Sequence, residues 1–252
     1  MHRRFKLYAM IIYLKKFVVS FLILFFLTSQ SYAQTNNGLA GWWRFDEGNG
    51  STTADSSGNG NTGTLVASPP WITGKYGHAL SFNGSTQYVS VPNSSSLNIA
   101  GAITLAAWVY PTSCTNGQQF QIAIWKEIQY TIALYNNGTC GVSWANATNW
   151  SYAAFGAYGN VTLNTWHFIA GTQDASNNVK IYLDGQLVNS QAFGGAIVQT
   201  SAPLVIGEWP DGSTYWFHGY IDEPRIYNRV LTPGEIYELF EGGAQTHTGS
   251  LS

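Results

Sequence analysis

Residues 219–231 read GYIDEPRIYNRVL and predict a buried strand close to the C-terminus. Ile221 should face a hydrophobic core, and Asp222 and Glu223 then place two adjacent carboxylates inside the same apolar strand. Burying two carboxylates costs free energy unless a cation or an arginine compensates their charge. We therefore expect a compensated cluster of charges on this strand.

The segment after this strand predicts one short helix. Thr232 and Glu235 have the spacing of a capping box, and Pro233 stands at the first helical position. Apolar side chains then recur at helical spacing, at Ile236, Leu239 and Phe240. Gly242 is suited to end the helix.

Short β-strands are predicted along the rest of the chain. Residues 103–110 alternate strictly, so that Ile103, Leu105, Ala107 and Val109 share one face. Asp184 and Gly185 form a tight turn between two alternating segments, which indicates a hairpin. The expected strands are 39–45, 64–66, 79–82, 88–91, 103–110, 121–126, 130–135, 140–144, 166–173, 179–183, 186–191, 203–208 and 216–227. Short strands, Gly and Asn turns and almost no helix predict an all-β, two-sheet antiparallel sandwich.

The first 33 residues have the features of a secretory signal peptide. Five basic residues precede the apolar run 17–27, and Ser31 and Ala33 supply small residues at a cleavage site. An uncleaved membrane anchor is the alternative, although the apolar run is short for a bilayer span of about 20 residues. We therefore expect a linker at 34–37, one domain at 38–242 and a disordered tail at 243–252.

Charge limits the classes of partner. The chain carries 11 basic and 13 acidic residues. Removal of the predicted signal peptide would leave six basic residues against 13 acidic ones, a formal charge of −7. This balance argues against binding to nucleic acid or to an anionic membrane. The composition is typical of a secreted or cell-surface β-sandwich, extracellular or periplasmic.

Two cysteines, Cys114 and Cys140, are the whole cysteine content. In an oxidising compartment they can form a disulfide bond, which would stabilise the fold by on the order of 3 kcal/mol in the chain-entropy model. The alternative is two separate buried thiols. The sequence has no C-x-x-C pair, so it does not support a redox motif or a zinc knuckle.

Several motifs resemble those of LamG-like jelly-roll domains, in the concanavalin A-like lectin/glucanase superfamily. They are WWRFDE (42–47), DSSGNGN (55–61), GKYGHALSFNG (74–84), TLAAWV (104–109), WHF (166–168), IYLDG (181–185) and the segment 219–231. The resemblance covers residues 38–242 and implies a jelly roll whose first and last strands are neighbours. Pro224 departs from the valine usual in this family. Because proline lacks a backbone donor, we expect a bulge or a lost pairing there.

The resemblance also implies a structural calcium ion, since related domains commonly hold one near the chain ends. Calcium takes six to eight oxygen ligands. The predicted ligands are Asp46, Asp55, Asn61 and Asp222, with Glu47 and Asn59 as substitutes. The alternative is a metal-free cluster in which Asp55 caps its own turn and Arg44 or Arg225 pairs with Asp222.

Aromatic residues in loop-rich segments indicate a surface for sugars, whose C–H faces stack on aromatic rings. The predicted ligand-binding residues are Trp144, Asn146, Asn149, Trp150 and Tyr152 in one group and Trp209, Asp211, Tyr215 and Trp216 in another. A weaker third group is Trp125 with Gln119 and Gln121. Trp43, Trp108 and Trp166 are expected in the core.

Catalysis is not expected. The sequence lacks the Glu-x-Asp-x-x-Glu strand of glucanases on this fold, and it contains neither G-x-S-x-G nor H-E-x-x-H. His78, His167 and His218 are isolated and fit structural roles better than catalytic ones. The predicted function is a secreted, non-catalytic carbohydrate-binding module with a structural calcium ion, whose partner is a glycan. An adhesion or protein-interaction domain is the alternative, and a polysaccharide hydrolase or lyase is the third hypothesis.

Overall fold

The computed structural model describes residues 36–114, 120–127, 129–146, 156–192, 195–209 and 215–242. Residues from Gly38 onward form one compact unit, and the residues before it cluster separately. The predicted signal peptide and tail lie outside the described residues. Within the described ranges, no helix is both long and apolar enough to cross a membrane.

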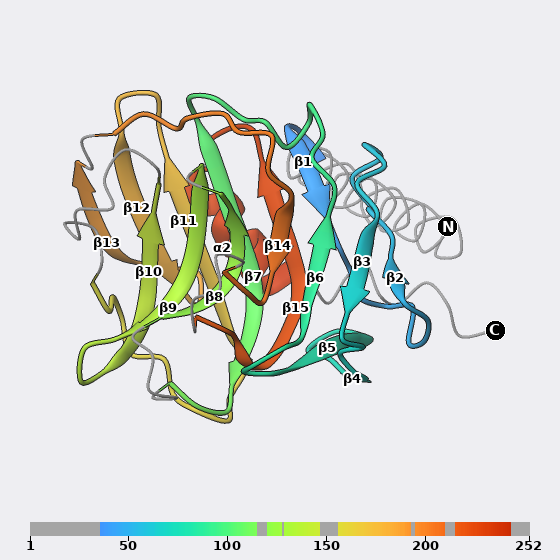
Figure 1. Ribbon diagram of the computed structural model, residues 1–252. Helices are drawn as coiled ribbons and strands as arrows, with labels where there is room; N and C mark the ends of the chain where they lie inside the picture. The colour runs from blue at the N-terminus through green and yellow to red at the C-terminus, as the bar shows by residue number, and fades with distance from the viewer. Residues whose placement is uncertain are drawn as a thin grey trace, which may run out of the picture. The chain divides into compact units, whose positions relative to one another are not determined.

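Two antiparallel sheets build the unit that starts at Gly38, as Figure 1 shows. Sheet 1 has the order β13 (Gln186–Ala192), β12 (Asn178–Leu183), β11 (His167–Gln173), β7 (Ile103–Pro111), β15 (His218–Tyr227), β5 (His78–Asn83) and β4 (Trp71–Thr73), with β1 (Leu39–Trp42) also paired to β15. Sheet 2 has the order β10 (Cys140–Ala145), β9 (Tyr130–Asn136), β8 (Phe120–Lys126), β14 (Leu204–Ile206), β6 (Tyr88–Val91), β3 (Gly63–Val66) and β2 (Thr52–Thr53). The predicted two-sheet jelly-roll sandwich is confirmed.

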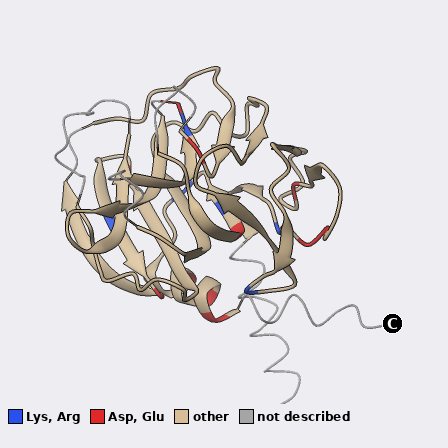
Figure 2. Ribbon diagram, turned by 60° about the horizontal axis from the view of Figure 1, so that its bottom comes forward, with Lys and Arg blue, Asp and Glu red and all other residues tan. Residues whose placement is uncertain are grey.

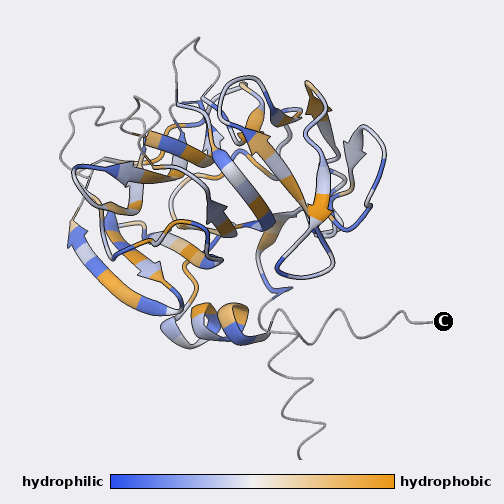
Figure 3. Cartoon of the chain, turned by 90° about the horizontal axis from the view of Figure 1, so that it is seen from below, coloured by the Kyte–Doolittle hydropathy of each residue, from blue (hydrophilic) through white to orange (hydrophobic). Residues whose placement is uncertain are grey.

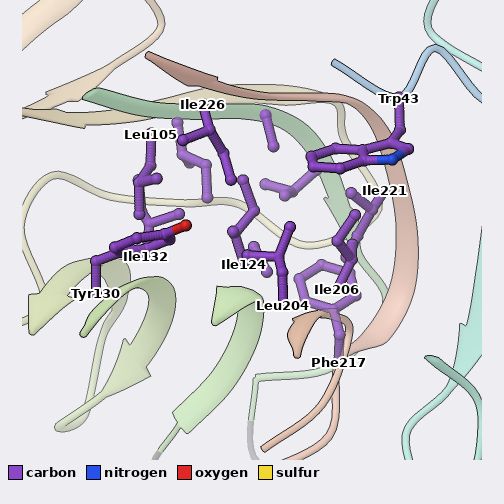
Figure 4. Close-up of a cluster of buried hydrophobic side chains, with 14 of the residues drawn as sticks. Trp43, Leu105, Ile124, Tyr130, Ile132, Leu204, Ile206, Phe217, Ile221 and Ile226 are labelled. Carbon is purple, nitrogen blue, oxygen red and sulfur yellow. The ribbon is translucent and has the colours of Figure 1, made fainter. Parts of the chain in front are cut away.

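The main core lies between the inner faces of the two sheets. Leu105, Ile221 and Ile226 come from sheet 1, and they meet Ile132 and Leu204 from sheet 2 (Figure 4). Hydrophilic and hydrophobic residues alternate along several strands in Figure 3, as expected of strands whose two faces have different surroundings. The alternation predicted for residues 103–110 is confirmed, because the predicted inward side chains all belong to this core.

A second core covers the outer face of sheet 1. The helix α2 (Pro233–Gly242) packs there, and Phe240 stacks on Trp108 with ring centroids 5.6 Å apart. The predicted capping box forms, because Glu235 N donates to Thr232 Oγ1 and Thr232 N donates to Glu235 Oε2. The apolar stripe of α2 therefore covers side chains of sheet 1, such as Trp108, that would otherwise lie on the surface.

The first and last strands are neighbours, as the resemblance implied. Trp42 on β1 pairs with Arg225 on β15, and the pairing of β15 with β7 shifts between Asp222 and Arg225. Glu223 has a positive φ of 54°, which is uncommon outside glycine and marks a β-bulge. The bulge expected at Pro224 is confirmed.

One disulfide bond joins a segment that follows a central strand of sheet 1 to an edge strand of sheet 2. Cys114 follows β7 of sheet 1, Cys140 begins β10 of sheet 2, and the two sulfur atoms are bonded. The structure thus resolves the alternative left by the sequence. The bond anchors the β9–β10 hairpin, whose turn contains Gly138 at a φ of 113°.

Candidate functional site

Aromatic side chains gather on the outer face of sheet 2, the side away from the main core. Its buried floor consists of Phe120, Ile122, Trp125, Ala133 and Val205, and its half-buried rim of Tyr88, Tyr135, Trp209 and Tyr215. We call this surface the aromatic face. Figure 2 shows that Asp, Glu, Lys and Arg are sparse over the ribbon as a whole.

A β-bulge in β8 builds the floor of the aromatic face. Side chains three residues apart normally point to opposite sides of a strand. The register of β8 against β9 shifts between Ile122 and Ile124, which leaves one extra residue in β8. Ile122 and Trp125 therefore both reach the outer face, while Ile124 enters the main core.

The rings of the aromatic face form a connected network. Trp209 lies 5.7 Å from Trp125 and 5.4 Å from Tyr215, measured between ring centroids. Phe120 lies 5.4 Å from Tyr215 and 4.6 Å from Tyr135. Aromatic pairs at such separations contribute about 0.5–1.5 kcal/mol each beyond the area they bury. The rim rings are thus held in place, with part of each ring open to solvent.

An unpartnered hydroxyl group lies on the same outer face. Ser143 Oγ is buried and has no hydrogen-bond partner. Leaving such a group unsatisfied costs about 1–3 kcal/mol. Ser143 is paired in register with Ala133 of the floor, so the unsatisfied hydroxyl belongs to the aromatic face. Apolar rings and one unsatisfied hydroxyl group thus lie on the same surface.

The structure shows where some of the predicted ligand-binding residues lie. Trp216 lies beside the rim residue Tyr88, with ring centroids 6.1 Å apart. Trp209 and Tyr215 lie together on the aromatic face, and so does Trp125 of the weaker third group. Gln121 is instead a structural residue, since its amide donates to Ser113 O and accepts from His218 N. Asn149, Trp150, Tyr152, Asp211 and Gln119 lie outside the described residues.

The prediction for Trp144 is wrong. Its side chain has no exposed area, lies in the main core, and donates from Nε1 to Gln173 Oε1. A Cβ atom on Gly171 of sheet 1 would come within 2.4 Å of the Trp144 ring, so this tryptophan fills the space between the sheets. The aromatic floor residue Phe120 and the rim residue Tyr135 were not predicted as ligand-binding residues.

Two of the predicted calcium ligands lie at one turn. Asp222 Oδ2 accepts from Tyr76 N and Asp46 Oδ1 accepts from His78 N, so both carboxylates hold the turn before β5. Asp222 is fully buried, and its Oδ1 atom has no hydrogen-bond partner. Burial raises the pKa of Asp222 to about 8, with smaller upward contributions from Glu223 and Asp46 and an opposing one from the Tyr76 N–H.

The other two predicted calcium ligands have partners within the protein. Asp55 accepts from Trp42 N, Ser57 N, Ser57 Oγ and Asn61 N, which uses both carboxylate oxygens. Asn61 Oδ1 accepts from the hydroxyl groups of Ser94 and Ser96. Asp55 therefore caps its own loop, as the metal-free alternative expected. Among the described residues, no three His, Cys, Asp or Glu side chains form a group suited to a metal ion.

Arginines compensate Glu223 in the adjacent bulge. Arg225 pairs with Glu223, whose Oε2 atom also accepts from Trp42 Nε1 at 2.6 Å. The Arg225 guanidinium lies 4.4 Å from the Trp42 ring centroid. Arg44 pairs with Asp46 at 3.1 Å. The compensated cluster predicted for this strand is therefore present, although the ion pairs shown for Arg44 and Arg225 go to Glu223 and Asp46, not to Asp222.

A family model for laminin G-type domains, described as the concanavalin A-like lectin/glucanases superfamily, matches residues 83–237. This range is more than half of the 252-residue chain and contains every residue of the aromatic face. The chain belongs to the concanavalin A-like lectin/glucanase superfamily. The family resemblance carried by the sequence motifs is confirmed.

Solved structures share the lectin/glucanase fold with this chain. Domain 4 of AbnA, a GH43 extracellular arabinanase from Geobacillus stearothermophilus, was solved with arabinotriose; it is 23% identical, with a TM-score of 0.61, over 80% of this chain and 97% of that domain. The binding domain of Paraclostridial Mosquitocidal Protein 1 is 15% identical, with a TM-score of 0.64, over 84% and 53%. A botulinum neurotoxin type C structure is 16% identical, with a TM-score of 0.61, over 84% and 52%. The chain thus spans about half the length of the two toxin chains.

Proposed function

We propose that the protein is an exported, non-catalytic carbohydrate-binding module whose glycan site is the aromatic face of sheet 2. The observation that carries the proposal is a connected set of half-buried rings on one outer face, beside the unpartnered Ser143 hydroxyl group. Sugars offer C–H faces that pack on rings and hydroxyl groups that satisfy such atoms. A purely apolar interface with another protein would offer the Ser143 hydroxyl group no hydrogen bond, which favours a glycan over the adhesion hypothesis.

The similar structures support the same class of ligand. The arabinanase domain was solved in complex with arabinotriose, and the neurotoxin structure concerns cell entry that depends on two ganglioside molecules. At this level of identity the likeness establishes the fold, and the binding of a glycan by this chain is our proposal. The Cys114–Cys140 disulfide supports export, because disulfides persist in oxidising compartments.

The proposal that the module is non-catalytic is supported by the sequence and by the use of its buried acids. The glucanase carboxylate triplet is missing from the sequence. Glu223 is engaged by Arg225 and Trp42, and Asp222 holds a turn. His167 is held between Asp184 and Thr162 by hydrogen bonds of 2.8 and 2.9 Å.

We retain calcium as a structural ligand in the proposal and narrow its site to Asp222 and Asp46. The unpartnered oxygen of Asp222 suits a cation, whereas the oxygens of Asp55 and the Oδ1 atom of Asn61 already accept hydrogen bonds. The ion would neutralise a buried carboxylate and hold the turn before β5. We expect chelator to lower the melting temperature. An unchanged melting temperature, with and without added calcium, would refute the calcium site.

The function is tested by retention on immobilised neutral polysaccharides, including arabinan, β-1,3-glucan and β-1,4-galactan. We expect the wild-type protein to be retained on at least one polymer and Trp209→Ala to lose that retention, because it removes a rim ring. Leu187→Ala is the matched control, since Leu187 lies on β13 of sheet 1 and is 52% exposed. The proposal fails if the wild-type protein is retained on none of these polymers or if Trp209→Ala binds as well as Leu187→Ala.

A further inference from the structure

Three side chains of sheet 2 bind the segment 112–114, which follows β7 of sheet 1. Gln121 on β8 donates from Nε2 to Ser113 O, and Asn136 on β9 donates from Nδ2 to the next carbonyl oxygen at 2.9 Å. The third link is the disulfide bond that starts from Cys140 on β10. We call these three links, from Gln121, Asn136 and Cys140, the clamp.

Gln121 is a buried polar residue whose side-chain amide is used at both ends. It is 2% exposed, and its Oε1 atom accepts from His218 N, at the start of β15, at 3.1 Å. The carbonyl oxygen of His218 accepts in turn from Thr112 N and Oγ1. A buried amide with both of its groups paired specifies one relative position of the strands that it joins. An apolar side chain in this place would pack without selecting that position.

Gly219 brings the start of β15 against the end of β7. Its φ is 141°, and a Cβ atom at this position would overlap Tyr110 O. Glycine alone tolerates both this conformation and this close approach. The backbones of the two strands are therefore in contact beside the clamp, which leaves the segment before β15 little room to shift.

The clamp lies beneath one part of the aromatic face. Gln121 directly follows Phe120, Asn136 directly follows Tyr135, and Tyr215 lies three residues before His218. The Phe120 ring lies 4.6 Å from the Tyr135 ring and 5.4 Å from the Tyr215 ring, measured between centroids. We call these three rings the corner. Because neighbouring side chains of a strand point to opposite sides, the clamp holds the backbone from within while the rings face outward.

We infer that the clamp positions the corner for glycan binding, and that binding therefore depends on the oxidised state of Cys114 and Cys140. Gln121 is a positioning residue, because it acts through Tyr215 and the neighbouring rings without touching the ligand. Closing the bond turns two thiols into one disulfide and passes two electrons and two protons to an oxidant such as a second disulfide. The module thus gains its full affinity in an oxidising compartment. This inference rests on the proposed carbohydrate function and adds its regulation.

The first test compares the oxidised wild-type protein with the same protein reduced by dithiothreitol, on a polysaccharide that retains the oxidised form. The chain has two cysteines, so the reductant changes this bond alone. We expect reduction to weaken binding about tenfold, the loss of one well-placed interface group. Leu239→Ala is the matched control, because it lowers stability by truncating a buried residue of α2 on sheet 1. Equal binding by the oxidised and reduced forms, both folded by circular dichroism, would overturn the inference.

The second test leaves the disulfide bond intact. Gln121→Met keeps the length of the side chain and removes both of its hydrogen bonds, and we expect binding to weaken about tenfold. The same substitution is then made in the Tyr215→Leu protein, which lacks the ring that Gln121 positions. The added loss should be about threefold or less there, because the two residues act as one unit. Equal losses in both backgrounds would show a general effect on stability and would refute the positioning role.

The outcomes separate this inference from the function on which it rests. If Trp209→Ala loses retention while reduction and Gln121→Met change nothing, the glycan site stands and the clamp does not position it. If the oxidised wild-type protein is retained on none of the polysaccharides, the proposed function and the inference both fail.

Discussion

Both sheets carry aromatic rings on their outer faces, but the two sets of rings differ in how far other side chains cover them. On sheet 1, Trp108 is covered by Phe240 of α2, by Tyr76 at 5.8 Å and by the Lys75 ammonium at 4.3 Å from the ring centroid. On sheet 2, Trp209 and Tyr215 form a half-buried rim over the floor. The covered face behaves as a second core, and the outer face of sheet 2 presents half-buried rings. The same fold thus obtains stability from one outer face and, on our proposal, binding from the other.

The two faces should differ most in how much stability the protein loses when one aromatic ring is removed. Trp108 is 3% exposed, so Trp108→Ala should lower the free energy of unfolding by about 3–5 kcal/mol. Trp209→Ala should cost far less stability, because Trp209 is half-buried. Urea unfolding measures both. Equal losses from the two substitutions would show that the rim of sheet 2 is a structural core like the face of sheet 1.

Removal of the disulfide bond is expected to have the next largest effect on stability. The bond links the end of β7 in sheet 1 to the start of β10 in sheet 2 across 26 residues. The double substitution Cys114→Ser, Cys140→Ser should cost on the order of 3 kcal/mol in the chain-entropy model. Chemical denaturation of the oxidised and reduced wild-type protein provides the comparison. If reduction leaves stability unchanged, the bond does not constrain the unfolded chain as that model requires.

The stability of the protein should depend on pH, because Asp222 is buried in sheet 1. Its pKa is raised from 3.8 to about 8, mainly by burial, with Glu223 and Asp46 adding to the effect. Between pH 4 and pH 8 the folded protein keeps a proton that the unfolded chain has lost, so the free energy of unfolding should fall as the pH rises. The contribution is fully present below pH 4 and lost as the pH rises through about 8.

The substitution Asp222→Asn tests this pH dependence, because it removes the titrating group. In chelator, the wild type should lose more than about 1.4 kcal/mol, the equivalent of one pKa unit, over this pH range relative to the variant. Glu223, Asp46, Arg225 and Arg44 remain in both proteins, so their titration cancels to first order. Parallel pH profiles would show that Asp222 is ionised in the folded protein.

The outer face of sheet 1, which α2 covers, was predicted from the sequence better than the aromatic face of sheet 2. The helix α2 follows from a capping box and an apolar stripe, both of which are local signals. β2 and β4 were missed because they contain only two and three residues. The sequence indicates Trp125 only weakly, since the bulge in β8 interrupts the alternation that would reveal a shared face. Trp144 was misplaced, although its two-residue spacing from the apolar Val142 was a signal that both side chains point inward.

The unpartnered atoms of the candidate site could not have been predicted from residue types. The sequence indicates Asn146 as a candidate for sugar binding, and only three-dimensional contacts show that its amide nitrogen is used within the sandwich while its oxygen is not. The same holds for Asp55 and Asp222. Both are aspartates in matching motifs, yet Asp55 accepts four hydrogen bonds within the protein and Asp222 keeps one unpartnered oxygen.

The smallest expected effect concerns the cap of α2, the helix that covers sheet 1. Thr232 Oγ1 accepts from Glu235 N at 3.2 Å, and Thr232→Ala should lower the free energy of unfolding by about 1 kcal/mol. Thr232→Ser is the matched control, because it keeps the hydroxyl group. Since α2 packs on sheet 1, retention on the neutral polymer should be the same for both variants. Loss of retention by Thr232→Ala at unchanged stability would instead assign the glycan to the α2 side of the sandwich, and the division between a covered face and a binding face would be wrong.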